Sequence, residues 1–192
     1  MDDKVDKIVV ERLMNVDHRE FKYFVELYAD MVFRVCNNFV NHRQNAEDLS
    51  QEVFIEVYNN IGQFKKESHI KTWIYRIAIN KSLNFLRKKK QNQWLANFGF
   101  LASFNEGEDK FQHEYVETST ETNYIKEEQK AILYKTIEKL PKNQRIAFTL
   151  NKIDELSYKE ISEIMNISVS SVESLIHRAK NSLQAKLLKL FL

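Results

Sequence analysis

The chain has 192 residues, of which three are glycine, one is proline and one is cysteine, and its formal net charge is +2. So few helix-breaking residues predict a nearly all-helical protein and exclude the glycine-rich loops that cradle phosphates and dinucleotides. The single Cys36 excludes an intramolecular disulfide and a cysteine-based zinc cluster. Its helical phase with Val32, Val35 and Phe39 predicts that Cys36 is buried.

Four helices are predicted in the N-terminal part of the chain from apolar residues that recur at helical spacing. They cover about residues 5–14, 21–39, 46–61 and 70–90, and Asn45 or a neighbour is expected to cap the third. Charge is segregated between the last two helices. Residues 44–64 hold four acidic residues and no lysine or arginine, whereas residues 65–94 hold nine basic residues and one acidic residue. Separate acidic and basic surfaces indicate two different partners.

The third predicted helix carries an acidic stripe in which Asp48, Glu52 and Glu56 recur every four residues, with Gln51 and Ile55 beside them. Like charges at this spacing destabilise an isolated helix by a few tenths of a kcal/mol each. A basic partner would explain why the stripe is tolerated. A face that is merely solvated explains it equally well.

The fourth predicted helix separates a basic side from an apolar side on a helical wheel. Lysine and arginine attract phosphates, asparagine can bind a base edge, and an exposed tryptophan can stack on an unpaired base. This mixture favours single-stranded or locally opened DNA. The alternative is a solvated basic helix with its tryptophan in the core. The basic side consists of Trp73, Arg76, Asn80, Lys81, Asn84, Arg87 and Lys88, with Ile77 among them.

Residues 95–123 are predicted to form an acidic linker, because they are rich in polar residues and show poor periodicity. Residues 95–125 carry six acidic residues and one lysine. Helices are expected again over about 125–140 and from Pro141, which suits the first turn of a helix.

The C-terminal segment predicts a helix-turn-helix, whose second helix enters the major groove of DNA. Ser157 and Glu160 form a capping box at the start of its first helix, Asn166 and Ile167 end that helix, and Ser168 caps the second. A plain helical hairpin is the alternative. The exposed face of the second helix carries Ser171, Glu173, Ser174, His177, Arg178 and Asn181.

These segments together resemble the extracytoplasmic-function (ECF) sigma factors of bacterial RNA polymerase. The resemblance rests on residues 46–54 (AEDLSQEVF), 72–80 (TWIYRIAIN), 140–148 (LPKNQRIAF) and 157–180, in this order. It implies an all-α fold of two small helical domains joined by the acidic linker. A four-helix sigma domain 2 would cover residues 1–94, the linker residues 95–123, and a helix-turn-helix sigma domain 4 residues 124–192.

The resemblance also assigns roles to residues. The core RNA polymerase would contact Asp48, Gln51, Glu52 and Phe54. The opened −10 strand of promoter DNA would contact Trp73, Arg76, Asn80, Lys81, Asn84 and Arg87, and the loop 65–71 would help to pocket a flipped base. The duplex −35 element would contact Ser171, Glu173, Ser174, His177, Arg178 and Lys180.

Relatives often carry arginine where this chain has Glu173 and Leu175, so further phosphate contacts would come from Lys142, Arg145, Lys159 or Lys180. Glu173 either accepts from a cytosine amino group or stabilises its own helix N-terminus. An anti-sigma factor is a further expected partner and could hold the protein at the membrane. We also expect the two domains of the free protein to be held together weakly, by the linker and complementary charge.

Two other classes of protein compete with this interpretation. A helix-turn-helix regulator that acts without polymerase would leave the acidic helix and Trp73 unexplained. A small helical enzyme would need converging titratable groups, but the five histidines lack metal-ligand spacing. No catalytic residue, metal or cofactor is therefore predicted. The sequence shows no signal peptide and no apolar run near the ~18 residues of a membrane span, so we expect a cytoplasmic protein without direct membrane insertion.

Overall fold

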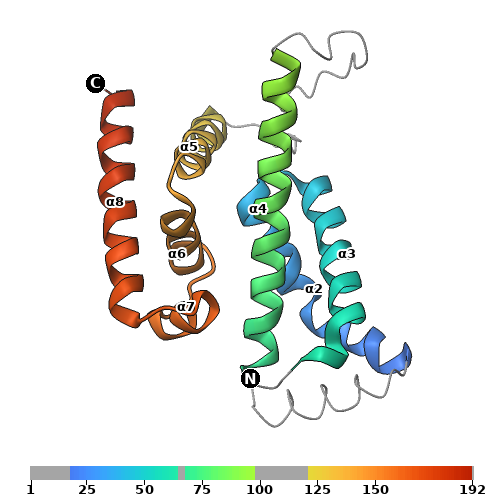
Figure 1. Cartoon of the computed structure of the whole chain (residues 1–192). Coiled ribbons are helices and arrows are strands. Elements are labelled where there is room, and N and C mark those ends of the chain that lie inside the picture. Colours follow the sequence, from blue (N-terminus) through green and yellow to red (C-terminus); the bar gives the residue numbers. More distant parts are fainter. Residues whose placement is uncertain (1–17, 65–67, 98–120, 192) are drawn as a thin grey trace.

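Figure 1 shows a computed structural model of the chain, which describes residues 18–64, 68–97 and 121–191. The described residues are helical, as predicted, and include no β-strand. The predicted helix over 5–14, residues 65–67 of the base-pocket loop, and linker residues 98–120 lie outside them. The elements are α2 (His18–Val40), α3 (Arg43–Asn60), the 3-10 helix η1 (Ile61–Gln63), α4 (Ile70–Asn97), α5 (Glu121–Glu138), α6 (Lys142–Lys152), α7 (Tyr158–Met165) and α8 (Val169–Phe191).

Helices α2, α3 and α4 pack against one another through their apolar faces (Figure 1). Phe24, Val32, Val53 and Ile74 have no exposed surface, and Cys36 is fully buried among them as predicted. Burying each such side chain contributes on the order of 1.5–3 kcal/mol. Ile77, the aliphatic residue that the helical wheel placed on the outward side of α4, is also buried.

Two helix boundaries in this part differ from the sequence prediction. Helix α3 begins at Arg43, and its N-cap is His42 instead of Asn45. His42 has an extended backbone, and its ring accepts a hydrogen bond from the Asn45 amide at 3.3 Å. Helix α4 continues to Asn97, into the segment predicted as linker. Its Lys- and Gln-rich end contains no glycine or proline that would stop a helix.

The helix-turn-helix has the predicted geometry. The Ser157 hydroxyl accepts from the Glu160 amide, and the Glu160 carboxylate accepts from the Ser157 amide at 2.9 Å, which completes the capping box. Asn166 ends α7 in the left-handed region at φ 54°, a conformation that asparagine tolerates well. Ser168 then accepts from the Ser171 amide at the start of α8. Val172, Ile176 and Leu183 form the buried stripe of α8.

Helices α5–α8 form a second group that packs directly against α2–α4. In Figure 1, α4 and α8 lie on opposite sides of α5, α6 and α7. The buried apolar cluster runs without interruption from α2, α3 and α4 into α6, α7 and α8. The expectation that the linker and complementary charge alone hold the two groups together is therefore wrong, because apolar packing also joins them.

Candidate nucleic-acid interfaces

The outward side of α4 forms a hollow of about 300 Å³ beside α3. Arg87 is exposed two turns beyond Asn80 on the same helix. Side chains predicted to contact the opened strand are brought together here, with one acidic residue from α3. The hollow is lined by Glu56, Trp73, Arg76, Ile77, Asn80, Lys81 and Asn84.

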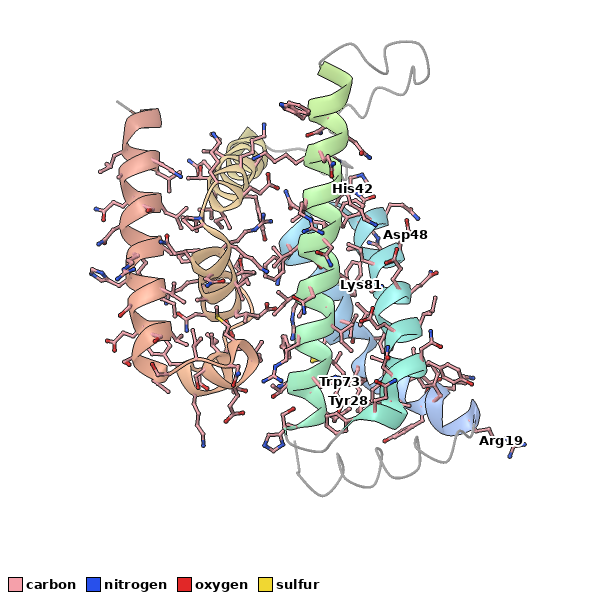
Figure 2. The ribbon with its side chains drawn as sticks, viewed as in Figure 1. Arg19, Tyr28, His42, Asp48, Trp73 and Lys81 are labelled. Carbon is pink, nitrogen blue, oxygen red and sulfur yellow. The ribbon has the colours of Figure 1, made fainter. Side chains whose placement is uncertain are left out.

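Trp73 is neither fully exposed nor fully buried in the core, the two alternatives that the sequence left open. Its indole is partly buried against the core, and its ring centroid is 5.3 Å from that of Phe64. Trp73 also lines the hollow, and Figure 2 places it near the start of α4. Phe64 therefore packs against the indole at an interplanar angle of 44°, and the part of the indole that stays accessible could stack on an unpaired base.

Lys81 connects the basic hollow with the acidic stripe, two features that the sequence suggested were separate. Its ammonium lies 3.0 Å from Glu56 and 3.5 Å from Glu52, across the gap between α4 and α3 (Figure 2). The hydrogen bond to Glu56 is the main cause that raises the pKa of Lys81. The charge of Lys81 is therefore partly balanced within the protein, in a position that faces the hollow.

The acidic stripe is exposed at Asp48, Gln51 and Glu52, as predicted for residues that meet a partner. Phe54 is the exception and corrects the prediction. Its ring is buried in the core, 6.4 Å from Phe24, because it lies on the inner side of α3. Phe54 can support the stripe but does not present a surface to a partner.

Two exposed apolar residues lie beside the stripe, Ile55, which the sequence placed there, and Tyr58, which the sequence analysis missed. Ile55 is 61% exposed and Tyr58 is 38% exposed, one turn apart on α3. Tyr58 also contacts Phe21 of α2 edge to face at 4.9 Å. Exposed apolar side chains beside charged ones are typical of a protein interface. The spacing of three residues from Ile55 is the signal that could have identified Tyr58.

Arg76 is placed differently from the prediction. Its guanidinium donates to the carbonyls of Ile164 at 3.0 Å and of Glu163 at 2.6 Å. These carbonyls belong to the last turn of α7, so Arg76 joins the two groups of helices. The side chain reaches the edge of the hollow, but its hydrogen-bonding groups are directed to α7 in this arrangement.

The recognition helix α8 presents a polar face. A hollow of about 460 Å³ lies along it and is closed on one side by Tyr158 of α7. His177 is exposed, and its Nδ1 lies 3.5 Å from the Asn181 amide nitrogen. Ser171 is held by the Ser168 hydroxyl at the helix start. The predicted −35 residues are all exposed, and the hollow is lined by Glu173, Ser174, His177, Arg178 and Lys180 among them.

Arg145 was one of the residues expected to contact phosphate, but the structure places it in the interior. It is buried, donates to the Phe39 carbonyl at 2.5 Å and lies over the Phe39 ring at 5.6 Å. Burial lowers the pKa of its guanidinium. Lys142, Lys159 and Lys180 are exposed and remain available for phosphate contacts. In the part of the chain that the structure describes, His, Cys, Asp and Glu side chains form no group that could hold a metal ion. Of the helices described, none is long and apolar enough to span a membrane.

Family models match both parts of the chain. Residues 24–92 match Sigma-70 region 2, and residues 130–183 match Sigma-70 region 4. The first of these ranges holds the acidic stripe and the α4 hollow, and the second holds the helix-turn-helix. The order and positions agree with the resemblance read from the sequence motifs.

Curated relatives are similar over nearly the whole chain. The ECF RNA polymerase sigma-E factor of Haemophilus influenzae is 34% identical, covering 95% of each chain. The ECF RNA polymerase sigma factor SigW of Bacillus subtilis is 32% identical, covering 93% of this chain and 94% of the relative.

Solved structures share the fold. CnrH, solved in complex with the cytosolic domain of CnrY, superposes with a TM-score of 0.65 at 20% identity, covering 95% of this chain and 96% of CnrH. The sigma factor RpoE from Bartonella quintana gives a TM-score of 0.58 at 22% identity, covering 89% of this chain and 98% of RpoE. The chain therefore belongs to the ECF RNA polymerase sigma factors, which direct promoter-specific initiation of transcription.

Proposed function

We propose that this sigma factor divides its work among three helices. Helix α3 binds core polymerase through Asp48, Gln51 and Glu52, helped by the exposed Ile55 and Tyr58. The α4 hollow binds the opened −10 strand, and α8 binds the −35 duplex. The two units that do this are taken as residues 1–94 and 124–192, joined by linker residues 95–123.

The α4 hollow is the observation that best supports the assignment at −10. It combines a half-buried indole, the exposed amides of Asn80 and Asn84, and the Lys81 ammonium in one open space. Stacking, base-edge hydrogen bonds and phosphate attraction are the three interactions that a single strand needs. A regulator that binds only duplex DNA has no use for the indole.

We also propose a protein partner for this chain and the compartment in which it acts. CnrH and RpoE were each solved in a complex, and for RpoE the partner is the anti-sigma factor NepR. We infer that an anti-sigma factor also binds this chain and that the chain acts in the cytoplasm, where transcription occurs. We also propose that it acts by binding.

Charge reversal on α3 tests the polymerase contact. Asp48→Arg with Glu52→Arg places cations one turn apart where the acidic stripe was, and we expect core polymerase to be lost in co-purification. The matched control is Glu26→Arg with Asp30→Arg, which makes the same change on exposed α2 positions with the same spacing. Circular dichroism checks that both variants stay helical. Wild-type recovery of polymerase with the α3 variant would refute this role of the stripe.

A further inference from the structure

The two groups of helices are joined by a buried polar contact between α2 and the turn after α6. Asp154 in that turn accepts a hydrogen bond from Asn38 at 3.0 Å and lies 3.5 Å from the Arg34 guanidinium. The Asp154 side chain has no exposed surface. A buried carboxylate is tolerated when it is paired and hydrogen-bonded, and both partners here come from the other group of helices.

A second contact runs in the opposite direction. Arg145 of α6 donates to the carbonyl of Phe39, which is in the last turn of α2. The last carbonyls of a helix lack partners within it and carry a partial negative charge. Arg145 therefore caps α2, while Asn38, next to Phe39, and Arg34, one turn before Asn38, bind Asp154.

A third contact involves the DNA-binding surface itself. Arg76 donates to the carbonyls of Glu163 and Ile164 in the last turn of α7. As in the contact of Arg145 with Phe39, a guanidinium donates to carbonyl groups at a helix end that lack partners within the helix. Arg76 cannot direct these donors to promoter DNA and to α7 at the same time. The closed arrangement therefore occupies a group that the −10 strand would need.

The closed arrangement is also too short for its promoter. The −10 and −35 elements are about 25 base pairs apart, or roughly 85 Å along B-DNA. The longest helix, α4, has 28 residues and spans only about 42 Å. A compact chain of 192 residues has a radius of gyration of roughly 16 Å. DNA is stiff over such a length, so the two groups of helices must separate before both elements are bound.

We propose that the free protein rests in this closed state, that pairing of Asp154 with Asn38 and Arg34 is the latch that holds it, and that closure opposes engagement of polymerase and promoter. The inhibitory role of closure rests on the proposed function, whereas the closed arrangement itself does not. The latch is intrinsic to the chain and needs no second protein. It explains why Arg34, Asn38 and Arg145 lie in the interface instead of on a DNA-binding face.

Distances between spin labels at Asn59→Cys in α3 and Ala185→Cys in α8 would measure closure in the full chain. Both positions are exposed, and the remaining Cys36 is buried. We expect one short distance in the wild type. Asn38→Ala and Asp154→Ala should each shift the ratio of open to closed protein about tenfold, as expected for loss of a charge-assisted hydrogen bond, and the double variant should add little.

Arg43→Ala is the control, since it removes an exposed ion pair with Glu47 within α3. Asn38→Ala lies outside the helix-turn-helix, so it tests the latch even if Asp154→Ala unfolds the turn. A wild type with only long distances, or latch variants with the wild-type distribution, would overturn the latch.

Binding to core polymerase tests the consequence of closure. Since the apparent dissociation constant rises as the competent fraction falls, the Asn38→Ala protein should bind polymerase several-fold more tightly than the wild type and the Arg43→Ala control. Equal affinity in a variant whose domains have separated would refute autoinhibition. The distance measurement uses neither polymerase nor DNA, so failure of the wild type to support transcription would overturn the proposed function without changing the measured closure.

Discussion

The Lys81 ammonium lies 3.0 Å from the Glu56 carboxylate, which places an acidic residue of α3 inside the hollow assigned to the −10 strand. Glu52 is a second partner at 3.5 Å. Because the Glu52 and Glu56 side chains are 57% and 42% exposed, solvent screens both pairs with Lys81, and the pairs add little to stability. The ion pairs instead change the electrostatic field that a DNA phosphate would experience in the hollow. Helix α3, which we propose faces polymerase, thus tunes the charge of α4, which we propose faces DNA.

Neutralising the two partners should have opposite effects on DNA binding by the assembled holoenzyme. Glu56→Gln removes a negative charge from the hollow and should strengthen binding to a −10 single strand several-fold. Lys81→Gln should weaken it for all sequences and reduce the salt slope by about one unit or less. Fluorescence anisotropy across a salt series measures both. Glu47→Gln, which loses an ion pair to Arg43 away from the hollow, is the control. Changes of the same sign for Glu56→Gln and Lys81→Gln would contradict the electrostatic account.

Substitutions of Trp73 and Asn80 should differ in how much they lower the free energy of unfolding. Trp73→Ala removes the contact with Phe64, so it should lower the free energy of unfolding and also impair strand opening, with roughly 1–3 kcal/mol lost from base stacking. Asn80 is exposed, so Asn80→Ala should leave stability within about 0.5 kcal/mol while weakening −10 discrimination. Permanganate footprints and urea denaturation separate the two effects. Normal opening by both variants would show that neither residue captures the opened strand.

The recognition helix should show a division between base reading and phosphate binding. His177→Ala should change which −35 sequence is preferred, because an exposed imidazole can exchange hydrogen bonds with base edges. Lys180→Ala should weaken all promoters alike and reduce the salt slope by about one unit. Lys186→Ala is the control on the same helix, since its ammonium is held by the Lys139 carbonyl at 3.2 Å. A promoter library selected with each variant reports the preference, and an unchanged −35 profile for His177→Ala would mean that His177 does not read bases.

Asp154 should make stability fall as pH rises through the acidic range. Burial raises the pKa of this carboxyl above its ordinary value of 3.8, and the opposing contributions from Arg34 and Asn38 are smaller. Burial raises the pKa of Tyr75 on α4 and of Tyr134 on α5, and the charge of Asp154 adds to both shifts. The folded protein therefore keeps a proton that the unfolded chain releases, so stability is greatest below the ordinary pKa and declines up to the raised one.

Urea denaturation of the wild type and Asp154→Asn between about pH 4 and pH 6 tests this assignment. The difference in free energy of unfolding between the wild type and Asp154→Asn should change across this pH range, since asparagine cannot titrate. Glu160 contributes with the opposite sign, because hydrogen bonds from Ser157 lower its pKa, but it is present in both proteins and cancels. Parallel curves would show that Asp154 does not carry a raised pKa.

Local signals explain what could be predicted from the sequence. The Ser157–Glu160 capping box is complete within four residues, so the start of α7 was correct. The apolar stripes of α2 and α8 were also correct, because burial follows helical periodicity. The start of α3 was missed because histidine is not a typical N-cap. The end of α4 was missed because its polar last turns contain no stop signal.

The remaining errors concern residues whose partners are distant in the sequence. Arg76 binds carbonyls 87 and 88 residues away, and Arg145 binds one that is 106 residues away. A helical wheel shows that such a side chain is polar and lies on one side, but not which other helix covers that side. Phe54 was misplaced for a different reason. The family motif includes it, but the motif does not distinguish residues that touch a partner from residues that support those that do.

Transcription of fragmented genomic DNA by purified core polymerase, with and without this protein, tests whether the chain directs initiation at specific promoters. We expect initiation at a discrete set of sites only when the protein is added, and these sites should share a −10 and a −35 element. The Asp48→Arg, Glu52→Arg variant should abolish these starts. Starts that are identical with and without the wild-type protein would contradict its role as a promoter-specificity subunit.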